Sequence, residues 1–124
     1  MAKGVKLHKE HLDAVNLFGK SISKRAGFRC EWCAGGEGLR LWEYHPDQEP
    51  SAGNLALLCD SCRALYASKS GDAHQLRLVR NALWSDIPAV AEGAAIVLAR
   101  CKESWARQAI EESFIDQALK ASLL

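Results

Sequence analysis

The sequence lacks long apolar runs, contains few prolines and shows neither an internal repeat nor a low-complexity segment. No uninterrupted apolar stretch reaches the ~18 residues that cross a bilayer. The first ten residues are charged and contain no apolar signal-peptide core. Only three of the 124 residues are proline. These absences exclude a membrane-spanning protein, and we expect the chain to be cytoplasmic and to have no membrane partner.

The composition is typical of a folded globular chain rather than a disordered one. Hydrophobic residues make up 48% and charged residues 25%, which leaves enough apolar surface to build a core. A length of 124 residues suits one domain or two small domains that share a core.

The net charge of +1 conceals a basic N-terminal arm. Residues 1–29 hold seven Lys/Arg and two Asp/Glu, a balance of +5, against −3 over residues 30–70 and −1 over residues 71–124. Such an arm can attract phosphates, although a solvated helix face has the same composition. Trp32 would stack on a base or pack over the cysteine turn beside it. The candidate nucleic-acid-binding residues are Lys20, Lys24, Arg25, Arg29 and Trp32.

Four of the five cysteines form two Cys-x-x-Cys pairs with 25 residues between them. Zinc takes four tetrahedral ligands, and two cysteines three positions apart reach one metal ion from a tight turn. Four thiolates leave no open position for water, so the site is structural rather than catalytic. The predicted ligands of one structural Zn²⁺ are Cys30, Cys33, Cys59 and Cys62, whereas Cys101 is expected to be a buried thiol.

Two other chemistries use the same cysteine pattern. A redox Cys-x-x-Cys occurs singly on a βαβ scaffold, and neither pair here has that setting. Four thiolates also suit an iron–sulfur centre. We therefore predict zinc and keep iron as an alternative.

The apolar patterns predict a small α+β fold, in which a basic N-terminal helix leads to a zinc ribbon or treble clef and then to a helical segment. Helical spacing covers residues 7–23, alternation predicts a strand over 39–44, and a short apolar run occupies 54–58. Helices are expected over 60–68, 73–83, 88–102 and 104–119, the last with a break near Ser113. The expected divisions are 1–26 (basic amphipathic helix), 27–68 (zinc-binding ribbon or treble clef) and 72–122 (helical domain).

The cysteine segments resemble the PhnA family, which is named after a phosphonate-utilisation operon. The likeness runs through Cys30-Glu31-Trp32-Cys33 and residues 39–43 and 54–63, and it returns in residues 84–90, which are similar to the family's Trp-Ser-acidic-aliphatic-Pro-Ala-Val signature. It covers roughly residues 20–118. The resemblance implies a zinc-binding protein. We do not carry over cleavage of a carbon–phosphorus bond, because the sequence offers no cluster of a nucleophile with open-site metal ligands.

The N-terminal half also resembles the zinc-bearing HNH nuclease fold, a treble clef. Such a nuclease needs a histidine base at the strand end and usually a histidine after the final cysteine. Here the ungapped strand positions are Trp42 and Glu43, His45 lies two residues further, and Arg63 follows the final cysteine. The resemblance therefore implies the fold without the nuclease chemistry. A structural loop role is expected for His45 in preference to an acid–base pair with Glu43.

These features predict a binding protein rather than an enzyme. We expect a PhnA-like adaptor or regulatory protein that contacts an unidentified protein or nucleic acid. One alternative is a nucleic-acid-binding protein with a degenerate HNH-like module. The other is a metal-dependent hydrolase of phosphonates or nucleic acid, with His45 as its candidate base. Gly93 and its alanine neighbours permit close helix packing within the chain or in a homodimer formed through the C-terminal helices.

Overall fold

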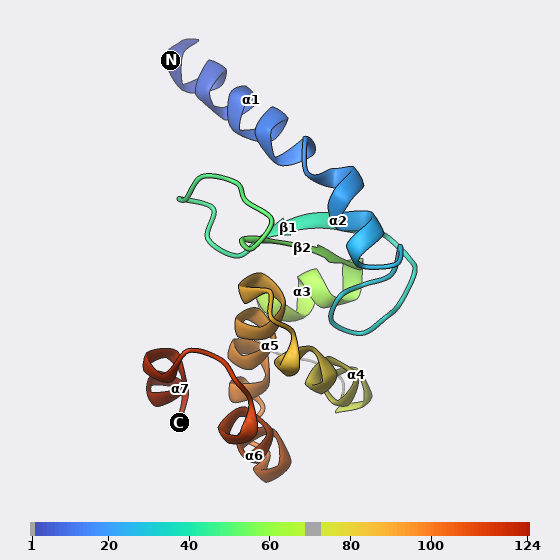
Figure 1. Ribbon diagram of the computed structural model, residues 1–124, viewed down its shortest axis with the longest axis vertical. Helices are drawn as coiled ribbons and strands as arrows, with labels where there is room; N and C mark the ends of the chain where they lie inside the picture. The colour runs from blue at the N-terminus through green and yellow to red at the C-terminus, as the bar shows by residue number, and fades with distance from the viewer. Residues whose placement is uncertain (1, 69–72) are drawn as a thin grey trace.

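The computed structural model describes residues 2–68 and 73–124, with side chains from residue 9 onward in the first helix (Figure 1). Within these ranges it contains helices and one two-stranded antiparallel sheet, which confirms a small α+β fold. No helix in this part of the chain is long and apolar enough to cross a membrane. The elements are α1 (Ala2–Asn16), α2 (Gly19–Arg25), β1 (Arg40–Glu43), β2 (Leu55–Leu58), α3 (Asp60–Ser68), α4 (Ala73–Val79), the 3-10 helix η1 (Arg80–Trp84), α5 (Pro88–Arg100), α6 (Ser104–Glu112) and α7 (Gln117–Leu123).

Strand β2 is the centre of the N-terminal half, because all four of its residues are buried. It pairs with β1 from Arg40 opposite Leu58 to Glu43 opposite Leu55. Alternate side chains of a strand point to opposite faces. Leu55 and Leu57 accordingly pack with residues of α1 and α2, whereas Ala56 and Leu58 belong to the larger core that continues into the C-terminal helices.

The prediction of a single helix over residues 7–23 is wrong, because this stretch belongs to two helices. Helix α1 ends at Asn16 and α2 begins at Gly19, after a turn in which the Phe18 amide donates to the Val15 carbonyl at 3.0 Å. Glycine within a helix costs roughly 1 kcal/mol relative to alanine, which favours a break there. The break lets α2 press Ile22 against β2, while α1 extends away from the rest of the protein (Figure 1).

Helix α5 lies at the centre of the helical half and carries the predicted Gly-Ala surface (Figure 1). A Cβ atom on Gly93 would lie 2.7 Å from Trp32 Cζ2 and 3.1 Å from Trp42 Cη2, so the glycine is needed for α5 to approach this pair. Ala89, Ala94 and Ala95 are fully buried. This surface is therefore used within the chain, and a homodimer through the C-terminal helices stays a prediction that needs another surface.

The other helices follow the expected pattern with local differences. Residues 73–83 tighten after Val79 into η1, and Pro88 occupies the first turn of α5, where its missing N–H costs nothing. The break predicted near Ser113 is confirmed, because α6 ends at Glu112 and the Ser113 hydroxyl donates to the Ile110 carbonyl at 2.7 Å.

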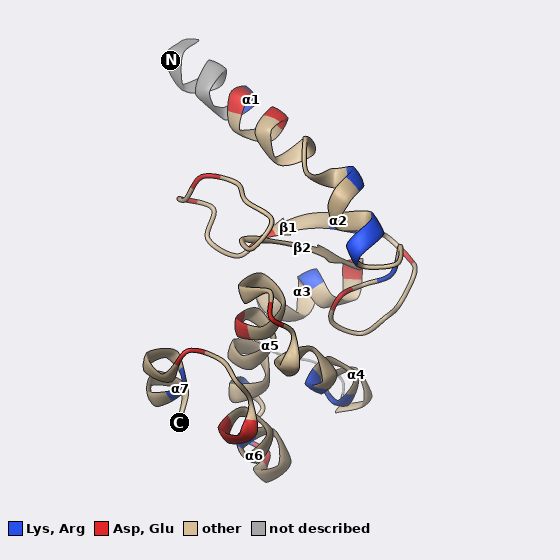
Figure 2. Ribbon diagram, viewed as in Figure 1, with Lys and Arg blue, Asp and Glu red and all other residues tan. Residues whose placement is uncertain are grey.

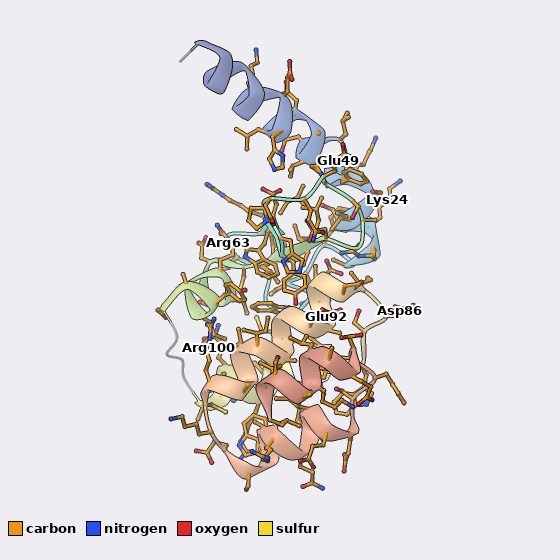
Figure 3. All side chains as sticks on the ribbon, turned by 90° about the vertical axis from the view of Figure 1, so that its left-hand side faces the viewer. Lys24, Glu49, Arg63, Asp86, Glu92 and Arg100 are labelled. Atoms are coloured by element: carbon orange, nitrogen blue, oxygen red, sulfur yellow. The ribbon has the colours of Figure 1, made fainter. Side chains whose placement is uncertain are left out.

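One hydrophobic core joins the sheet and the helical half. The large core contains Trp32, Leu58 and Cys62 from the cysteine-bearing segment together with Leu83 and Leu98 from the helices. At the boundary lies Glu92 of α5, which is labelled in Figure 3. Its carboxylate accepts a hydrogen bond from the Tyr44 hydroxyl at 3.1 Å. Burial, followed by the nearby carboxylate, raises the pKa of Tyr44, so this phenol stays a hydrogen-bond donor even above the ordinary pKa of tyrosine.

Candidate metal centre

The first cysteine pair lies in a tight turn that we call the cysteine turn (residues 30–35). The Cys30 amide donates to the Gly35 carbonyl at 2.7 Å, and the Ala34 amide donates to the Cys30 carbonyl at 2.9 Å. Ala34 has a φ of 67°, an uncommon conformation for a residue with a side chain. This backbone places the sulfurs of Cys30 and Cys33 on the same side of the turn.

The second pair is placed by the junction between β2 and α3. Cys59 directly follows the strand, and Cys62 lies in the first turn of the helix. Residues three apart at a helix start face the same way, so both sulfurs reach the cysteine turn. All five cysteines are free thiols, and Cys101 lies apart from the other four. Cys101 is half-buried rather than buried as expected, and its sulfur donates to the Leu98 carbonyl at 3.0 Å.

The four sulfur atoms form a cluster that fits one zinc ion. They all lie within 4.8 Å of one another, and the sulfurs of Cys33 and Cys59 are 3.6 Å apart. A zinc ion with four sulfurs at ~2.3 Å requires sulfur–sulfur separations of about 3.8 Å. Cys30, Cys59 and Cys62 are buried and Cys33 is half-buried. Within the part of the chain that the structure describes, no other group of three or more His, Cys, Asp or Glu residues could hold a metal.

Amide N–H groups point at the sulfurs. The Cys33 amide donates to Cys30 Sγ at 3.5 Å, and the Gly35 amide donates to Cys33 Sγ at 3.4 Å. The side-chain amide of Gln75, on α4, donates to Cys62 Sγ at 3.6 Å. Such donors orient metal ligands and stabilise thiolate charge. Gln75 also connects the cluster to the helical half.

The thiols of the cluster cannot all ionise easily without a cation. The hydrogen bond from Cys62, followed by backbone N–H donors, lowers the pKa of Cys30 despite burial. Burial raises the pKa of Cys33. The hydrogen bond to Cys30, then burial and the charge on Cys30, raise the pKa of Cys62. Crowded thiolates repel one another, and a divalent cation reverses this repulsion.

Glu31, between the two cysteines of the turn, fastens the turn to the sheet. Its side chain is 8% exposed and accepts from Arg25 Nε at 3.0 Å, from Arg25 Nη2 at 2.7 Å and from the Leu57 amide at 2.9 Å. Arg25 also donates to the carbonyls of Ala52 and Leu55, at 2.8 and 2.9 Å. Sequence reasoning missed this role of Glu31. The available signal was an acidic residue inside a turn with apolar neighbours.

The five residues proposed to bind nucleic acid do not form one surface. Arg25 is committed to Glu31 and to backbone carbonyls. Trp32 is 2% exposed, its indole N–H donates to the Val90 carbonyl at 3.1 Å, and its ring packs against Trp42. A ring buried in this way cannot stack on a base, so Trp32 has the packing role instead. The three remaining residues, Lys20, Lys24 and Arg29, are exposed.

The nuclease-like pair does not form either. Glu43 Oε1 lies 2.6 Å from His11 Nε2 on α1, while the His45 ring lies against Tyr44 with centroids 3.8 Å apart. Asn54 bonds the His45 backbone twice, accepting from its amide and donating to its carbonyl, each at 2.9 Å. Asn54 is buried and closes the loop between β1 and β2. The His45 backbone is therefore part of the loop structure, and a structural role for its imidazole stays a prediction.

Comparison with known proteins identifies no relative. No protein-family model, no curated protein and no solved structure matches this chain. The resemblances to the PhnA family and to the HNH fold thus rest on the motifs alone.

Proposed function

We propose that this chain is a zinc-binding protein whose single metal ion is structural and which acts as an adaptor or regulatory protein rather than as an enzyme. The observation that supports the proposal is the cluster of four cysteine sulfurs within 4.8 Å of one another. Four thiolates fill the tetrahedral coordination of zinc and leave no position for water or substrate. When bound, the ion would offset half of the charge of the four thiolates and cross-link two segments of the chain.

The surroundings of the cluster suit a scaffold role. Two residues of the cysteine turn make hydrogen bonds to other elements, Glu31 to β2 and Trp32 to α5. The sulfur of Cys62, the fourth member of the cluster, accepts a hydrogen bond from Gln75 of α4. A metal ion at the sulfurs would therefore fix how the sheet and the helical half are oriented. A fixed orientation favours binding, because less conformational entropy is lost when a partner docks.

The PhnA resemblance agrees with a zinc-binding role, and the hydrolase alternative lacks support from the site. Phosphonate or nucleic-acid hydrolysis needs an activated nucleophile with an open metal position. His45, the candidate base, lies in an exposed loop with its ring against Tyr44, and Glu43 pairs with His11. These positions leave His45 without the Glu43 partner that the acid–base pair considered from the sequence would need.

Nucleic-acid binding is a second candidate, favoured by three exposed cations. Lys20, Lys24 and Arg29 form no ion pair with any of the described residues, and Figure 2 shows basic residues on both α2 and α4. Anisotropy with a fluorescein-labelled oligonucleotide tests it. A Lys20→Ala/Lys24→Ala variant should weaken binding at every sequence alike and reduce the salt slope. Binding that ignores both salt and this change removes the candidate.

Native mass spectrometry of the untagged protein, purified without added metal, tests the main proposal. We expect one zinc per chain and no second metal. A zinc-free folded chain, or an iron-containing chain with visible absorbance, contradicts the structural-zinc proposal. A second bound metal would return the hydrolase alternative to consideration and make His45→Ala the next variant.

A further inference from the structure

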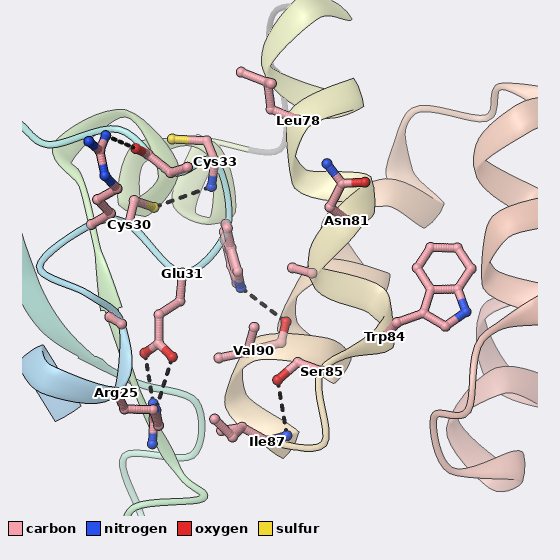
Figure 4. A pocket seen from close by; sticks show the side chains of 15 residues that line it. Arg25, Cys30, Glu31, Cys33, Leu78, Asn81, Trp84, Ser85, Ile87 and Val90 are labelled. Atoms are coloured by element: carbon pink, nitrogen blue, oxygen red, sulfur yellow. Dashed lines mark hydrogen bonds and ion pairs between the residues drawn. The ribbon is translucent and has the colours of Figure 1, made fainter. Parts of the chain in front are cut away.

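The two edges of the sheet formed by β1 and β2 differ in what covers them. At the outer edge of β2, the Glu31 amide donates to the Leu57 carbonyl at 2.8 Å, and the Leu57 amide donates to the Glu31 carboxylate at 2.9 Å. Arg25, whose bonds to Glu31 are drawn in Figure 4, donates to the Leu55 carbonyl at 2.9 Å. The outward backbone groups of Leu57 and the carbonyl of Leu55 therefore have partners within the chain.

These bonds fix which groups of β1 point outward. In an antiparallel pair, residues opposite each other either exchange both backbone hydrogen bonds or exchange neither. Leu41 and Glu43 lie opposite the two residues of β2 whose groups point outward, so their own N–H and C=O groups point away from β2. The Tyr44 amide donates to the Asn54 carbonyl at 2.9 Å, so the adjacent pair is a bonded one, as this alternation requires.

The outer edge of β1 is open. No described residue makes a hydrogen bond to the outward N–H and C=O groups of Leu41 and Glu43. These groups form a row with the spacing of a β-strand, and another extended backbone offers donors and acceptors at the matching spacing. The edge is therefore a template for strand pairing, whereas the opposite edge is covered by the chain itself.

A groove of about 670 Å³ follows this edge, between β1 and α1. Its walls carry apolar side chains from both elements, among them Leu41 and Leu12, which is 45% exposed. Among its described lining residues the two charged ones, Arg40 and Glu43, have opposite signs, and none is a cysteine of the metal centre. The groove therefore selects an occupant by backbone bonding and apolar contact rather than by net charge.

We propose that this groove binds a short extended segment of a partner protein, which adds to β1 as the third strand of the sheet. The segment bonds through its backbone to Leu41 and Glu43. Its side chains at alternate positions face α1, and these are apolar and pack on Leu12 and Leu41. Strand β1 is four residues long, so the edge suits a short segment. The inference rests on the proposed adaptor role and deepens it by naming the surface and the kind of partner.

A partner segment fits this edge better than a second copy of β1 does. Two β1 strands related by a two-fold axis use all the outward groups only if Leu41 of one copy lies opposite Glu43 of the other. That register sets an apolar side chain against a carboxylate on one face of the sheet. Pairing Glu43 with Glu43 opposes like charges, and pairing Leu41 with Leu41 leaves Glu43 opposite residue 39, outside the strand. A segment of different sequence has none of these mismatches.

Peptide selection on the full-length, zinc-loaded protein tests the inference. A displayed random heptapeptide library is selected on the wild type and counter-selected on Leu12→Asp, and enriched peptides are measured by fluorescence anisotropy. The matched control is Leu17→Asp, which makes the same change at an 85% exposed position that is not among the described lining residues of the groove. Both leucines are exposed, so both variants should keep the wild-type fold. Zinc content and near-UV circular dichroism are measured in each.

Backbone N-methylation of an enriched peptide distinguishes strand addition from binding through side chains alone. A paired strand directs alternate amides to β1, so N-methylation at every second residue should weaken binding at least roughly tenfold, while the residues between tolerate it. In hydrogen exchange followed by NMR, the Leu41 and Glu43 amides should slow at least about tenfold when the peptide binds. The Trp42 amide, on the side bonded to β2, should exchange slowly in both states.

We expect Leu12→Asp to weaken enriched peptides at least roughly tenfold and Leu17→Asp to bind them as the wild type does. Failure of the selection to yield a peptide that distinguishes the wild type from Leu12→Asp overturns the inference. Binding without the alternate pattern of N-methyl sensitivity also overturns it, as does protection of the Leu41 and Glu43 amides by self-association without peptide. A zinc-free protein that still binds the peptide contradicts only the zinc role, and a zinc-loaded protein without peptide binding contradicts only this inference.

Discussion

Removal of the Glu31 carboxylate tests how the cysteine turn is held. In Glu31→Ala, the guanidinium of Arg25 loses its only carboxylate partner among the described residues, and the Leu57 amide loses its side-chain acceptor. The Arg25 side chain is 23% exposed, so solvent can reach only part of the uncompensated charge. The variant should therefore unfold more easily than the wild type even though no metal ligand has been changed.

The size of the effect follows from burial. Breaking a buried ion pair by removing one partner costs about 3–5 kcal/mol, and an orphaned buried amide costs about 1–3 kcal/mol. Arg25 keeps its bonds to the carbonyls of Ala52 and Leu55, and its partial exposure offsets some of the loss. We expect the free energy of unfolding to fall by about 3 kcal/mol.

Urea denaturation at a fixed free zinc concentration measures this change, because bound metal contributes to the apparent stability. The matched control is Glu111→Ala, which breaks an ion pair with Arg107 whose side chains are 55% and 60% exposed. Such an exposed pair contributes about 0.5 kcal/mol or less. Adding Arg25→Met to Glu31→Ala should cost less than the sum of the single changes. Equal losses in Glu31→Ala and Glu111→Ala would refute the reasoning.

Three other perturbations have defined outcomes. Cys62→Ser should abolish stoichiometric zinc binding and the near-UV circular dichroism of the tryptophans, whereas Cys101→Ser should retain both. Zinc retained by Cys62→Ser would contradict a four-ligand site. Gly93→Ala should lower the free energy of unfolding by about 1–2 kcal/mol, because the clash with Trp32 and Trp42 exceeds the gain in helix propensity. Gly36→Ala, with open space around it, should change this free energy by less than about 0.5 kcal/mol. The pKa values of Cys33 and Cys62 are raised in the metal-free cluster, so zinc must displace protons and its affinity should fall as pH falls. Calorimetry in buffers of different ionisation enthalpy counts the released protons, and zero release would contradict thiolate ligation.

The elements nearest the cysteines were the most predictable part of the fold. Spacing alone brought the two pairs to one site, because each pair needs only a local turn or a helix start. The helix over residues 60–68 agrees with α3 at both ends. The all-apolar run before it became the buried strand β2, whose two faces both meet a core.

Long-range contacts set the limits of prediction. The sequence shows Arg25 as one more cation of a basic arm, and its partner in the cysteine turn becomes visible only when α2 packs on the sheet. The sequence allows Trp32 either to stack on a base or to pack over the cysteine turn, and its packed position depends on the Val90 carbonyl of α5, which lies far along the chain. The helix break before Gly19 depends on two effects, the low helix propensity of glycine and the packing of Ile22 against β2. The spacing of apolar residues does not show which effect is larger.

The contact between Gly93 and the aromatic pair bears on how this chain can be divided. All four predicted zinc ligands precede residue 63, so a fragment ending there would contain the complete ligand set. Such a fragment would nevertheless expose Trp32 and Trp42, whose apolar rings pack beneath α5 in the intact chain. Exposed apolar patches promote aggregation. A metal-loaded fragment should therefore self-associate, and adding α5 as a separate peptide should restore a monomer.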